Sequence, residues 1–421
     1  MAKIRPFRCV RPTEEVASRV AALPYDVYNR EEAKRETERE PLSFLSIDRA
    51  ETWFPDSVGT YDACVYEKAR EVLNRRIKDG IFLMEEEPCY YLYELTRSGH
   101  IQTGIVACSS VDDYLNGVIK KHENTRADKE QDRICHVDVT NAQTGPIFLA
   151  YRARHALREL CAGVRAQEKP IYDFTAPDRV RHRVFRISEP DQIRLITEEM
   201  EAVPSTYIAD GHHRAASAIR VAQMRREQHP DYDGSEEFNY FLSILFPDEE
   251  LSILPYNRAV ADLNGLSQDA FLERVQEHFR ITGRMTTVMA GEGKGGRLPQ
   301  KKGEFCMLLD DIWYRVEARE EIRTEDPVRG LDVSLLQDYL LNPVLGIEDP
   351  RTSSRIAFIG GVRGTKELER RVHNDMRVAF SMYPTSLAEL FAVADAGRLM
   401  PPKSTWFEPK PRSGLFIHFL E

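Results

Sequence analysis

The chain has 421 residues, enough for two or three domains with sizeable cores, and a formal net charge of -10. This acidic balance argues against a general nucleic-acid binder, because capture of phosphate backbones needs a strongly basic face. No apolar run approaches the roughly 18 residues that span a bilayer, so we expect no membrane partner. The scattered cysteines form no CxxC pair, which is typical of reduced thiols and favours a cytoplasmic location.

The first 110 residues predict alternating helices and strands. Asn29 is a good N-cap residue for a charged helix, and apolar residues at helical spacing follow further along the chain. Tyr25 and Asp26 precede the first helix, and we interpret them as part of a structural loop. The predicted elements are a helix at 30–39, a strand at 41–48, a helix at 61–80, and a hairpin of strands at 89–95 and 100–109.

A charge-dense run at 118–133 contains Lys120, His122 and Glu123. Its composition alone indicates a solvated helix face. Its position between a strand and the apolar segment 145–151 instead favours the wall of a cleft. Both interpretations stay open on the sequence.

The stretch from Ser205 to Met224 predicts a buried strand that turns directly into a helix. The residues between the two are Asp210, Gly211, His212, His213 and Arg214. A helix that begins so abruptly presents unsatisfied backbone N–H groups and the positive end of its dipole, which together favour an anion. The alternative is local: Asp210 caps the helix, Gly211 supplies a turn, and the histidines make hydrogen bonds nearby.

The remaining elements alternate in the same way. The most apolar segment, 238–247, is expected at the centre of a sheet. The Gly- and Lys-rich segment 289–303 is predicted as a loop, and it is not a phosphate loop because its Gly-Lys pair precedes Gly. Helices are predicted at 151–161, 191–202, 267–279, 332–341, 365–372 and 386–396. Strands are predicted at 171–176, 182–187, 305–309, 312–316, 355–359, 378–384 and 415–420.

These elements predict a mixed α/β fold with mixed sheets, because hairpins and strand-helix units interleave along the chain. A catalytic body is expected over 1–250, followed by a C-terminal α/β part over 251–421. The proline-rich tail near 400–410 is predicted to be an ordered loop that folds back on the body.

At Asp210 to Arg214 the sequence resembles a widespread prokaryotic family long labelled a domain of unknown function. Other segments carry the same resemblance: LPYDVYN at 23–29, KHENT at 121–125, GPIFLAY at 145–151, LFP at 245–247, LPYNR at 254–258, RIAFIGG at 355–361 and MPPKSTWFEPK at 400–410. The Asp-Gly-X-His-Arg core also resembles the signature of the ParB and sulfiredoxin superfamily, which includes a free serine kinase. The cysteine of the sulfiredoxin motif is replaced by His212, and no helix-turn-helix of the ParB kind is recognisable.

The resemblance implies a ParB/sulfiredoxin-like nucleotide-binding core and phosphoryl transfer from ATP or ADP, with Mg²⁺, to a small hydroxylated metabolite. Free L-serine is the best acceptor by resemblance. Lys120, Gly211, His212, His213 and Arg214 are then expected to hold the phosphates. Glu123 is the expected base, with Asp210 as an alternative base or a metal-side ligand and His122 beside the migrating group. From the tail, Lys403, Ser404 and Lys410 are expected to close over the substrate or nucleotide.

Two other functions stay open. A nucleotide-binding regulatory switch would bind nucleotide without turnover. A metal-dependent hydrolase would use His122, Glu123, Asp210, His212 and His213 as ligands, although no HExxH-like spacing supports a metal site. The sequence makes no prediction of the oligomeric state.

Overall fold

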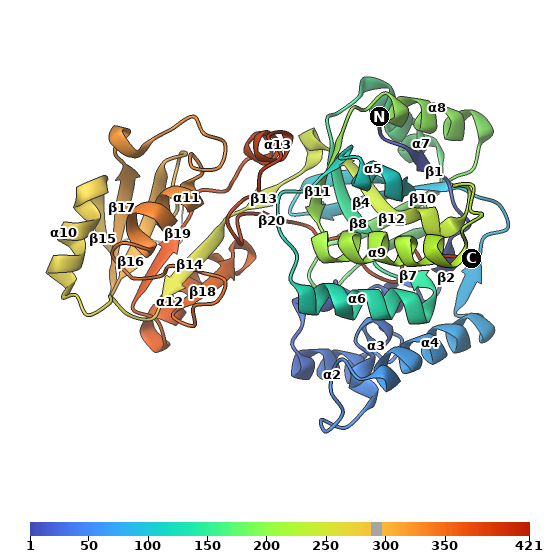
Figure 1. Ribbon diagram of the computed structural model, residues 1–421, viewed down its shortest axis with the longest axis horizontal. Helices are drawn as coiled ribbons and strands as arrows, with labels where there is room; N and C mark the ends of the chain where they lie inside the picture. The colour runs from blue at the N-terminus through green and yellow to red at the C-terminus, as the bar shows by residue number, and fades with distance from the viewer. Residues whose placement is uncertain (288–296) are drawn as a thin grey trace. The chain divides into compact units, whose positions relative to one another are not determined.

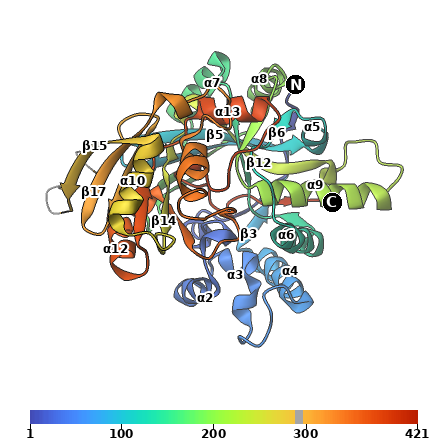
Figure 2. The ribbon, with the colours of Figure 1, turned by 60° about the vertical axis from the view of Figure 1, so that its left-hand side comes forward.

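The computed structural model describes residues 1–287 and 297–421 (Figure 1, Figure 2). The chain divides into two compact units, Met1–Leu251 with Pro409–Glu421, and Ser252–Glu408. Most of the Gly- and Lys-rich segment predicted as a loop falls on 288–296, outside the described residues. Within the described ranges, no helix combines the length and apolar character needed to cross a membrane.

The first unit is built on a mixed sheet with the strand order β6-β11-β8-β12-β5-β4-β10-β9, and β1 pairs with β5. Strand β12 runs parallel to β8 and antiparallel to β5. The strands are β1 (Ile4–Arg5), β4 (Tyr90–Arg97), β5 (His100–Ser110), β6 (Ile119–Lys120), β8 (Ile147–Tyr151), β9 (Tyr172–Thr175), β10 (Arg181–Ile187), β11 (Thr206–Asp210) and β12 (Tyr240–Pro247). This mixture of parallel and antiparallel pairs confirms the predicted fold class. The apolar β12 lies inside the sheet, as its composition predicts.

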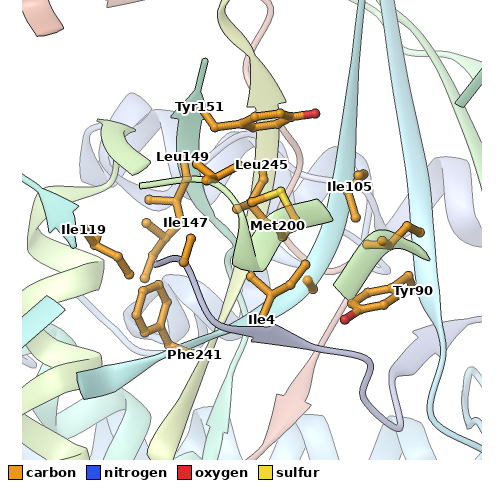
Figure 3. Close-up of a cluster of buried hydrophobic side chains, with 14 of the residues drawn as sticks. Ile4, Tyr90, Ile105, Ile119, Ile147, Leu149, Tyr151, Met200, Phe241 and Leu245 are labelled. Atoms are coloured by element: carbon orange, nitrogen blue, oxygen red, sulfur yellow. The ribbon is translucent and has the colours of Figure 1, made fainter. Parts of the chain in front are cut away.

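A buried apolar cluster joins this sheet to the helices that cover it. Figure 3 shows its centre, where side chains of β5, β8 and β12 meet Ile4, Tyr90 and Met200. Leu157 and Ala215 extend the same cluster into two other helices. The helices are α5 (Val111–Leu115), α6 (Ala127–Thr140), α7 (His155–Gln167), α8 (Pro190–Glu201) and α9 (His212–Gln228). Helix α6 packs along α9 (Figure 1), which places the charge-dense run beside the predicted anion site.

The segment before the sheet is helical where a strand was predicted. Pro41–Asp48 was expected to be extended, but Leu45–Asp48 forms the short helix α3. The Arg76 guanidinium donates to the carbonyls of Pro41 and Leu42 at 2.7 and 3.0 Å. These carbonyls therefore need no neighbouring strand as a hydrogen-bond partner. A short apolar run is compatible with both strand and helix, so the sequence pattern could not decide between them. The nearby elements are β2 (Val10–Pro12), α1 (Ala17–Val20), α2 (Arg30–Arg39), α4 (Ala63–Lys78) and β3 (Phe82–Met84).

The second unit carries an antiparallel sheet with the strand order β15-β17-β16-β19-β14-β18. The predicted hairpin at 305–309 and 312–316 is confirmed as β16 and β17. The elements are β14 (Tyr256–Val260), α10 (Gln268–His278), β15 (Phe279–Thr286), β16 (Glu304–Leu309), β17 (Ile312–Ala318), α11 (Asp332–Leu336), β18 (Ile356–Gly360), α12 (Gly364–Asn374), β19 (Val378–Ser381) and α13 (Leu387–Asp395), with β13 (Ile253–Leu254) paired to β20 (Trp406–Phe407).

The last 13 residues, Pro409–Glu421, pack within the first unit. Gln102 donates to the carbonyl of Pro409 at 2.8 Å, and Phe416 is fully buried against Tyr91 and Tyr93. The strand predicted over 415–420 is shorter: β21 (His418–Phe419) pairs with β7 (Ala142–Gln143). Chain segments far apart in sequence therefore complete one core.

Candidate functional site

Strand β11 and helix α9 meet at Gly211, whose φ of +93° lies in the left-handed region. A Cβ atom at this position would lie 3.0 Å from Nε and Nη2 of Arg214. Both the backbone conformation and the close approach of the guanidinium therefore favour glycine here. The predicted change from strand to helix within a few residues is confirmed.

Asp210 ends β11 as the centre of an ion-pair cluster. Its two carboxylate oxygens accept from Nη2 of Arg214 and from Nζ of Lys410, each at 2.8 Å. Burial alone would raise the pKa of Asp210, but the charges of Lys410 and Arg214 hold it below its ordinary value. Among the described residues, the hydrogen bonds that its oxygens accept come from these two cations and not from a backbone N–H of α9. Asp210 therefore fixes two cations beside the helix start instead of capping the helix.

His212 and His213 both accept hydrogen bonds from the charge-dense run at 118–133. The backbone N–H of His122 donates to Nε2 of His212 at 3.5 Å, and that of Arg126 donates to Nε2 of His213 at 2.9 Å. The rings of His122 and His212 also meet edge to face, with centroids 4.6 Å apart. The α9 start and the segment 122–126 are thereby joined.

Two of these imidazoles are uncharged at neutral pH. Burial lowers the pKa of His122 to about 4. Burial also lowers the pKa of His212 well below its ordinary value. These rings can donate or accept hydrogen bonds, but they add no positive charge to an anion site.

Lys120 supplies a positive charge next to this pair of histidines. It belongs to β6, which runs parallel to β11 with Lys120 opposite Tyr207. Its ammonium lies 5.9 Å from the centroid of the Tyr207 ring. The structure thus brings together the two segments that the sequence singled out separately.

One group of side chains in the described part of the chain has the spacing of a metal site. His122, Glu123 and His212 each offer one ligand atom, and these atoms lie within 4.8 Å of one another. Two imidazoles and one carboxylate suit a transition metal such as Zn²⁺, whereas Mg²⁺ prefers oxygen ligands. The expected Mg²⁺ therefore fits this donor set poorly. His213 and Asp210 are not members of the group.

Lys403 and Ser404 belong to the second unit. The Lys403 carbonyl accepts from Arg258 at 3.0 Å. Ser404 is buried, its hydroxyl donates to the carbonyl of Pro401 at 2.7 Å, and its own carbonyl accepts from Thr385. Both residues thus make contacts inside their own unit, and their role over a substrate stays a prediction.

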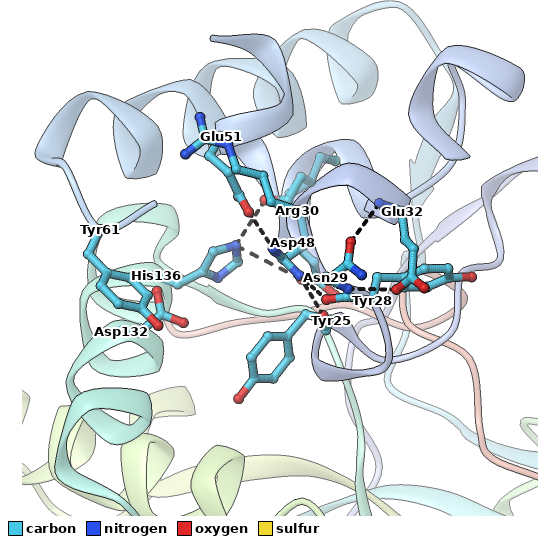
Figure 4. Close-up of polar contacts among 12 residues, drawn as sticks. Tyr25, Tyr28, Asn29, Arg30, Glu32, Asp48, Glu51, Tyr61, Asp132 and His136 are labelled. Carbon is cyan, nitrogen blue, oxygen red and sulfur yellow. Dashed lines mark hydrogen bonds and ion pairs between the residues drawn. The ribbon is translucent and has the colours of Figure 1, made fainter. Parts of the chain in front are cut away.

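A charged cavity in the first unit was not predicted from the sequence. Figure 4 shows polar side chains around it, among them Asp48, Glu51 and Asp132. The cavity has a volume of about 230 Å³. Its lining includes Tyr25, Asp26, Asp48, Arg49, Glu51, Lys129, Asp132, Arg133 and His136. The sequence analysis treated Tyr25 and Asp26 as structural. The sequence did contain one indication of this cavity. Arg133 and His136 lie three residues apart and therefore share one face of α6.

The family model described as "Protein of unknown function (DUF1015)" matches residues 4–334. The chain belongs to this family. The match ends before RIAFIGG at 355–361 and MPPKSTWFEPK at 400–410, two of the segments quoted for the resemblance. A search of the curated proteins finds no match for this DUF1015 chain.

Solved structures similar to the DUF1015 chain include a free serine kinase mutant in complex with ADP. That similarity has 13% identity and a TM-score of 0.32, and it covers 72% of this chain and 87% of the other. SbnI from Staphylococcus aureus, with a C-terminal truncation, has 13% identity and a TM-score of 0.36 over 74% and 85% of the two chains. A conserved hypothetical protein from Pyrococcus furiosus has 14% identity and a TM-score of 0.30 over 72% and 90%. Likeness at this level does not identify the ligand of this chain.

Proposed function

We propose that this DUF1015 chain is a phosphotransferase that uses ATP or ADP, with Mg²⁺, to phosphorylate a small hydroxylated metabolite. Free L-serine is the acceptor that the Asp-Gly-X-His-Arg resemblance favours. The observation that carries the proposal is the start of α9, where Asp210 holds Arg214 and Lys410 beside the first turn of the helix and the positive end of its dipole.

Positive charge and hydrogen-bond donors at this position suit the terminal phosphates of a nucleotide. The helix dipole, Arg214, Lys410 and Lys120 supply the charge. The neutral ring of His212 would contribute hydrogen bonds only. Because Asp210 already fixes two of the cations, they need little reorganisation when a phosphate arrives.

In the proposed reaction the acceptor hydroxyl oxygen attacks the terminal phosphorus of the nucleotide. A new P–O bond forms, the bond from that phosphorus to the bridging oxygen breaks, and the nucleotide leaves with one phosphate fewer. We assign the hydroxyl proton to Glu123. Asp210 is the weaker base candidate, because both its oxygens are occupied and its pKa is held low. Mg²⁺ would neutralise charge on the phosphates, whose oxygens suit it as ligands. Asp210 would join them only by giving up its ion pair with Arg214 or Lys410.

The variant Glu123→Gln separates a kinase from a nucleotide-binding switch. A kinase that uses Glu123 as the base should lose about 100-fold or more in the rate of ADP or AMP formation with L-serine, and should still bind the nucleotide. A switch should bind nucleotide tightly, turn over little, and respond weakly to the substitution. Glu159→Gln, on the exposed face of α7, is the matched control and should behave like the unaltered protein. The proposal fails if the protein neither binds a nucleotide nor transfers phosphate to any hydroxylated metabolite.

A metal-dependent hydrolase is the second candidate, and the proximity of His122, Glu123 and His212 favours it. It requires a transition metal retained by the purified protein in a ratio near one per chain. The variant His212→Ala should release that metal. A metal-free protein that still transfers phosphate in the presence of Mg²⁺ would exclude this candidate.

A further inference from the structure

The cavity in the N-terminal part of the first unit is lined by several buried charged side chains, three of which Figure 4 labels: Asp48, Glu51 and Asp132. Asp48, Glu51, Asp132 and Arg133 are all at least nine-tenths buried. Charged groups are rarely placed this deep unless they are paired with one another or with a ligand. At about 230 Å³ the cavity is smaller than the roughly 300–1,000 Å³ typical of pockets for drug-sized ligands. It therefore suits a compact metabolite.

Two of the buried carboxylates have an arginine partner inside the protein. Asp132 accepts from Nε of Arg133 at 2.9 Å and from the Tyr66 hydroxyl at 3.0 Å. Glu51 accepts from Nε of Arg49 at 2.7 Å. The charges of these two carboxylates are therefore neutralised without a ligand.

Asp48 has no such partner, although only 4% of it is exposed. One oxygen accepts from the Thr144 hydroxyl at 2.8 Å and lies 3.9 Å from Nε2 of His136. Burial lowers the pKa of His136, so this ring is neutral at pH 7. Among the described residues, no lysine or arginine lies within 4 Å of the Asp48 carboxylate, and its second oxygen accepts no hydrogen bond. The charge of Asp48 interacts with that of Arg133 without a direct ion pair. A cationic group of a ligand would give this buried carboxylate a direct partner.

Arg133 provides the opposite charge in the same cavity. Its Nε and Nη2 are used by Asp132 and by the carbonyl of Asp48. Its Nη1 donates to no residue in the part of the chain that the structure describes. A ligand carboxylate could accept from this nitrogen while an ammonium group on the same molecule meets Asp48.

The cavity adjoins the start of α9. A narrower cavity of about 30 Å³ shares Tyr25, Asp48, Arg133 and His136 with it and is also lined by Arg214. A small molecule held at Asp48 and Arg133 would therefore lie near Arg214, one of the proposed phosphate-binding residues. A molecule in this cavity would be separate from most of the proposed phosphate-binding residues but adjacent to Arg214.

We propose that this cavity is the acceptor site and that it binds a small α-amino acid, with the ammonium group on Asp48 and the carboxylate on Arg133. Its assignment as the acceptor site rests on the proposed phosphotransferase function. The binding of an amino acid in the cavity does not, because it follows from the unpaired charge of Asp48 and the available donor of Arg133.

Calorimetry on the full chain tests the site with L-serine, L-threonine and glycine, and with two probes that each lack one charge. L-glycerate lacks the ammonium group, and ethanolamine lacks the carboxylate. We expect an amino acid to bind, and each probe to bind about 10- to 100-fold more weakly, the loss of one charge-assisted hydrogen bond. The site is overturned if no amino acid binds, or if L-glycerate and ethanolamine bind as tightly as the amino acids.

The variant Asp48→Asn keeps the acceptor for Thr144 and removes the charge. It should weaken amino-acid binding about 10- to 100-fold. It should also raise the melting temperature of the ligand-free protein by about 2–4 °C, because a buried charge without a direct ion pair is removed. Asp138→Asn, on the same helix as Arg133 but paired with Arg225, is the matched control and should leave binding unchanged. Unchanged binding in Asp48→Asn would overturn the site.

A phosphoryl-transfer assay on the same variants separates this inference from the proposed function. Amino-acid binding that depends on Asp48, without any transfer of phosphate, would support the site and contradict the phosphotransferase. Transfer to an amino acid with the same KM in Asp48→Asn as in the unaltered protein would support the phosphotransferase and contradict the site.

Discussion

Gly211 lets α9 begin directly after the end of β11. Its φ of +93° is strained for any residue with a side chain, and a Cβ atom would press on the Arg214 guanidinium at 3.0 Å. That guanidinium also binds Asp210. The geometry of the proposed anion site therefore depends on the absence of one methyl group.

Gly211→Ala should destabilise the protein by about 1–3 kcal/mol, because it places alanine in a left-handed conformation and displaces Arg214. Gly163→Ala is the contrasting control. Gly163 lies within α7 with open space around its Cβ position, so alanine there should stabilise by about 0.5–1 kcal/mol. Scanning calorimetry of the two variants measures both effects, and equal effects would contradict the assigned role of Gly211.

Buried neutral histidines make the stability of the first unit depend on pH. The pKa of His122 is about 4 in the folded chain, below its ordinary value near 6.5. Between these values the unfolded chain binds a proton that the folded chain does not. The stabilisation is therefore complete above pH 6.5 and is lost as the pH falls towards 4.

Urea unfolding at pH 7.0, 5.5 and 4.5 should show the free energy of unfolding falling, with up to about 3 kcal/mol of the loss due to His122. His122→Gln should flatten this dependence. His155→Gln, whose side chain is 81% exposed, should leave it unchanged. An equal slope in His122→Gln and in the unaltered protein would contradict a neutral, buried His122.

The residues at the α9 start could be predicted because the sequence changes there from strand to helix spacing within a few positions. Their separate partners in 120–126 could be named but not placed, since the parallel pairing of β6 with β11 is a long-range contact. Asp48, which we propose as a site residue, was missed for another reason. Its segment has an apolar pattern in which a single carboxylate indicates the end of an element. Its surroundings depend on residues from other segments, Thr144 and His136.

At the scale of elements, side-chain caps fix where several helices begin. Asn29 and Glu32 form a capping box at α2, which agrees with the predicted N-cap. Ser386 and Glu389 form another at α13 in the second unit. The prediction of a strand over 41–48 was wrong. That segment offers no comparable local signal, and Arg76 from α4 donates hydrogen bonds to its carbonyls.

Ser386→Ala should cost about 1 kcal/mol by removing the acceptor for the Glu389 N–H. Hydrogen-deuterium exchange should then accelerate in the first turn of α13. The amides of α12, which has no side-chain cap, serve as the internal control. Faster exchange throughout the second unit, or no change at α13, would contradict a local cap.

At the scale of the whole molecule, the chain leaves the first unit at Leu251 and returns to it at Pro409. The returning segment is part of the core, since Leu415, Phe416 and Ile417 are fully buried. It also supplies Lys410 to Asp210. Interleaved hairpins and strand-helix units sufficed to predict mixed sheets. The strand order could not be predicted, because it is set by contacts between segments up to hundreds of residues apart.

Phe416→Ala should destabilise the first unit by about 3–5 kcal/mol, because it leaves a cavity between Tyr91 and Tyr93. Phe416→Leu should cost less, since it retains most of the buried volume. Thermal unfolding measures both, and a melting temperature unchanged in Phe416→Ala would show that the tail is not part of the core.

The most direct test of the central proposal is a ³¹P NMR time course of the protein with ATP or ADP, Mg²⁺ and L-serine. The account predicts a new phosphomonoester resonance that grows as the terminal phosphate of the nucleotide disappears, and that growth should stop in Glu123→Gln. Nucleotide resonances that stay unchanged, or that yield inorganic phosphate alone, would contradict it.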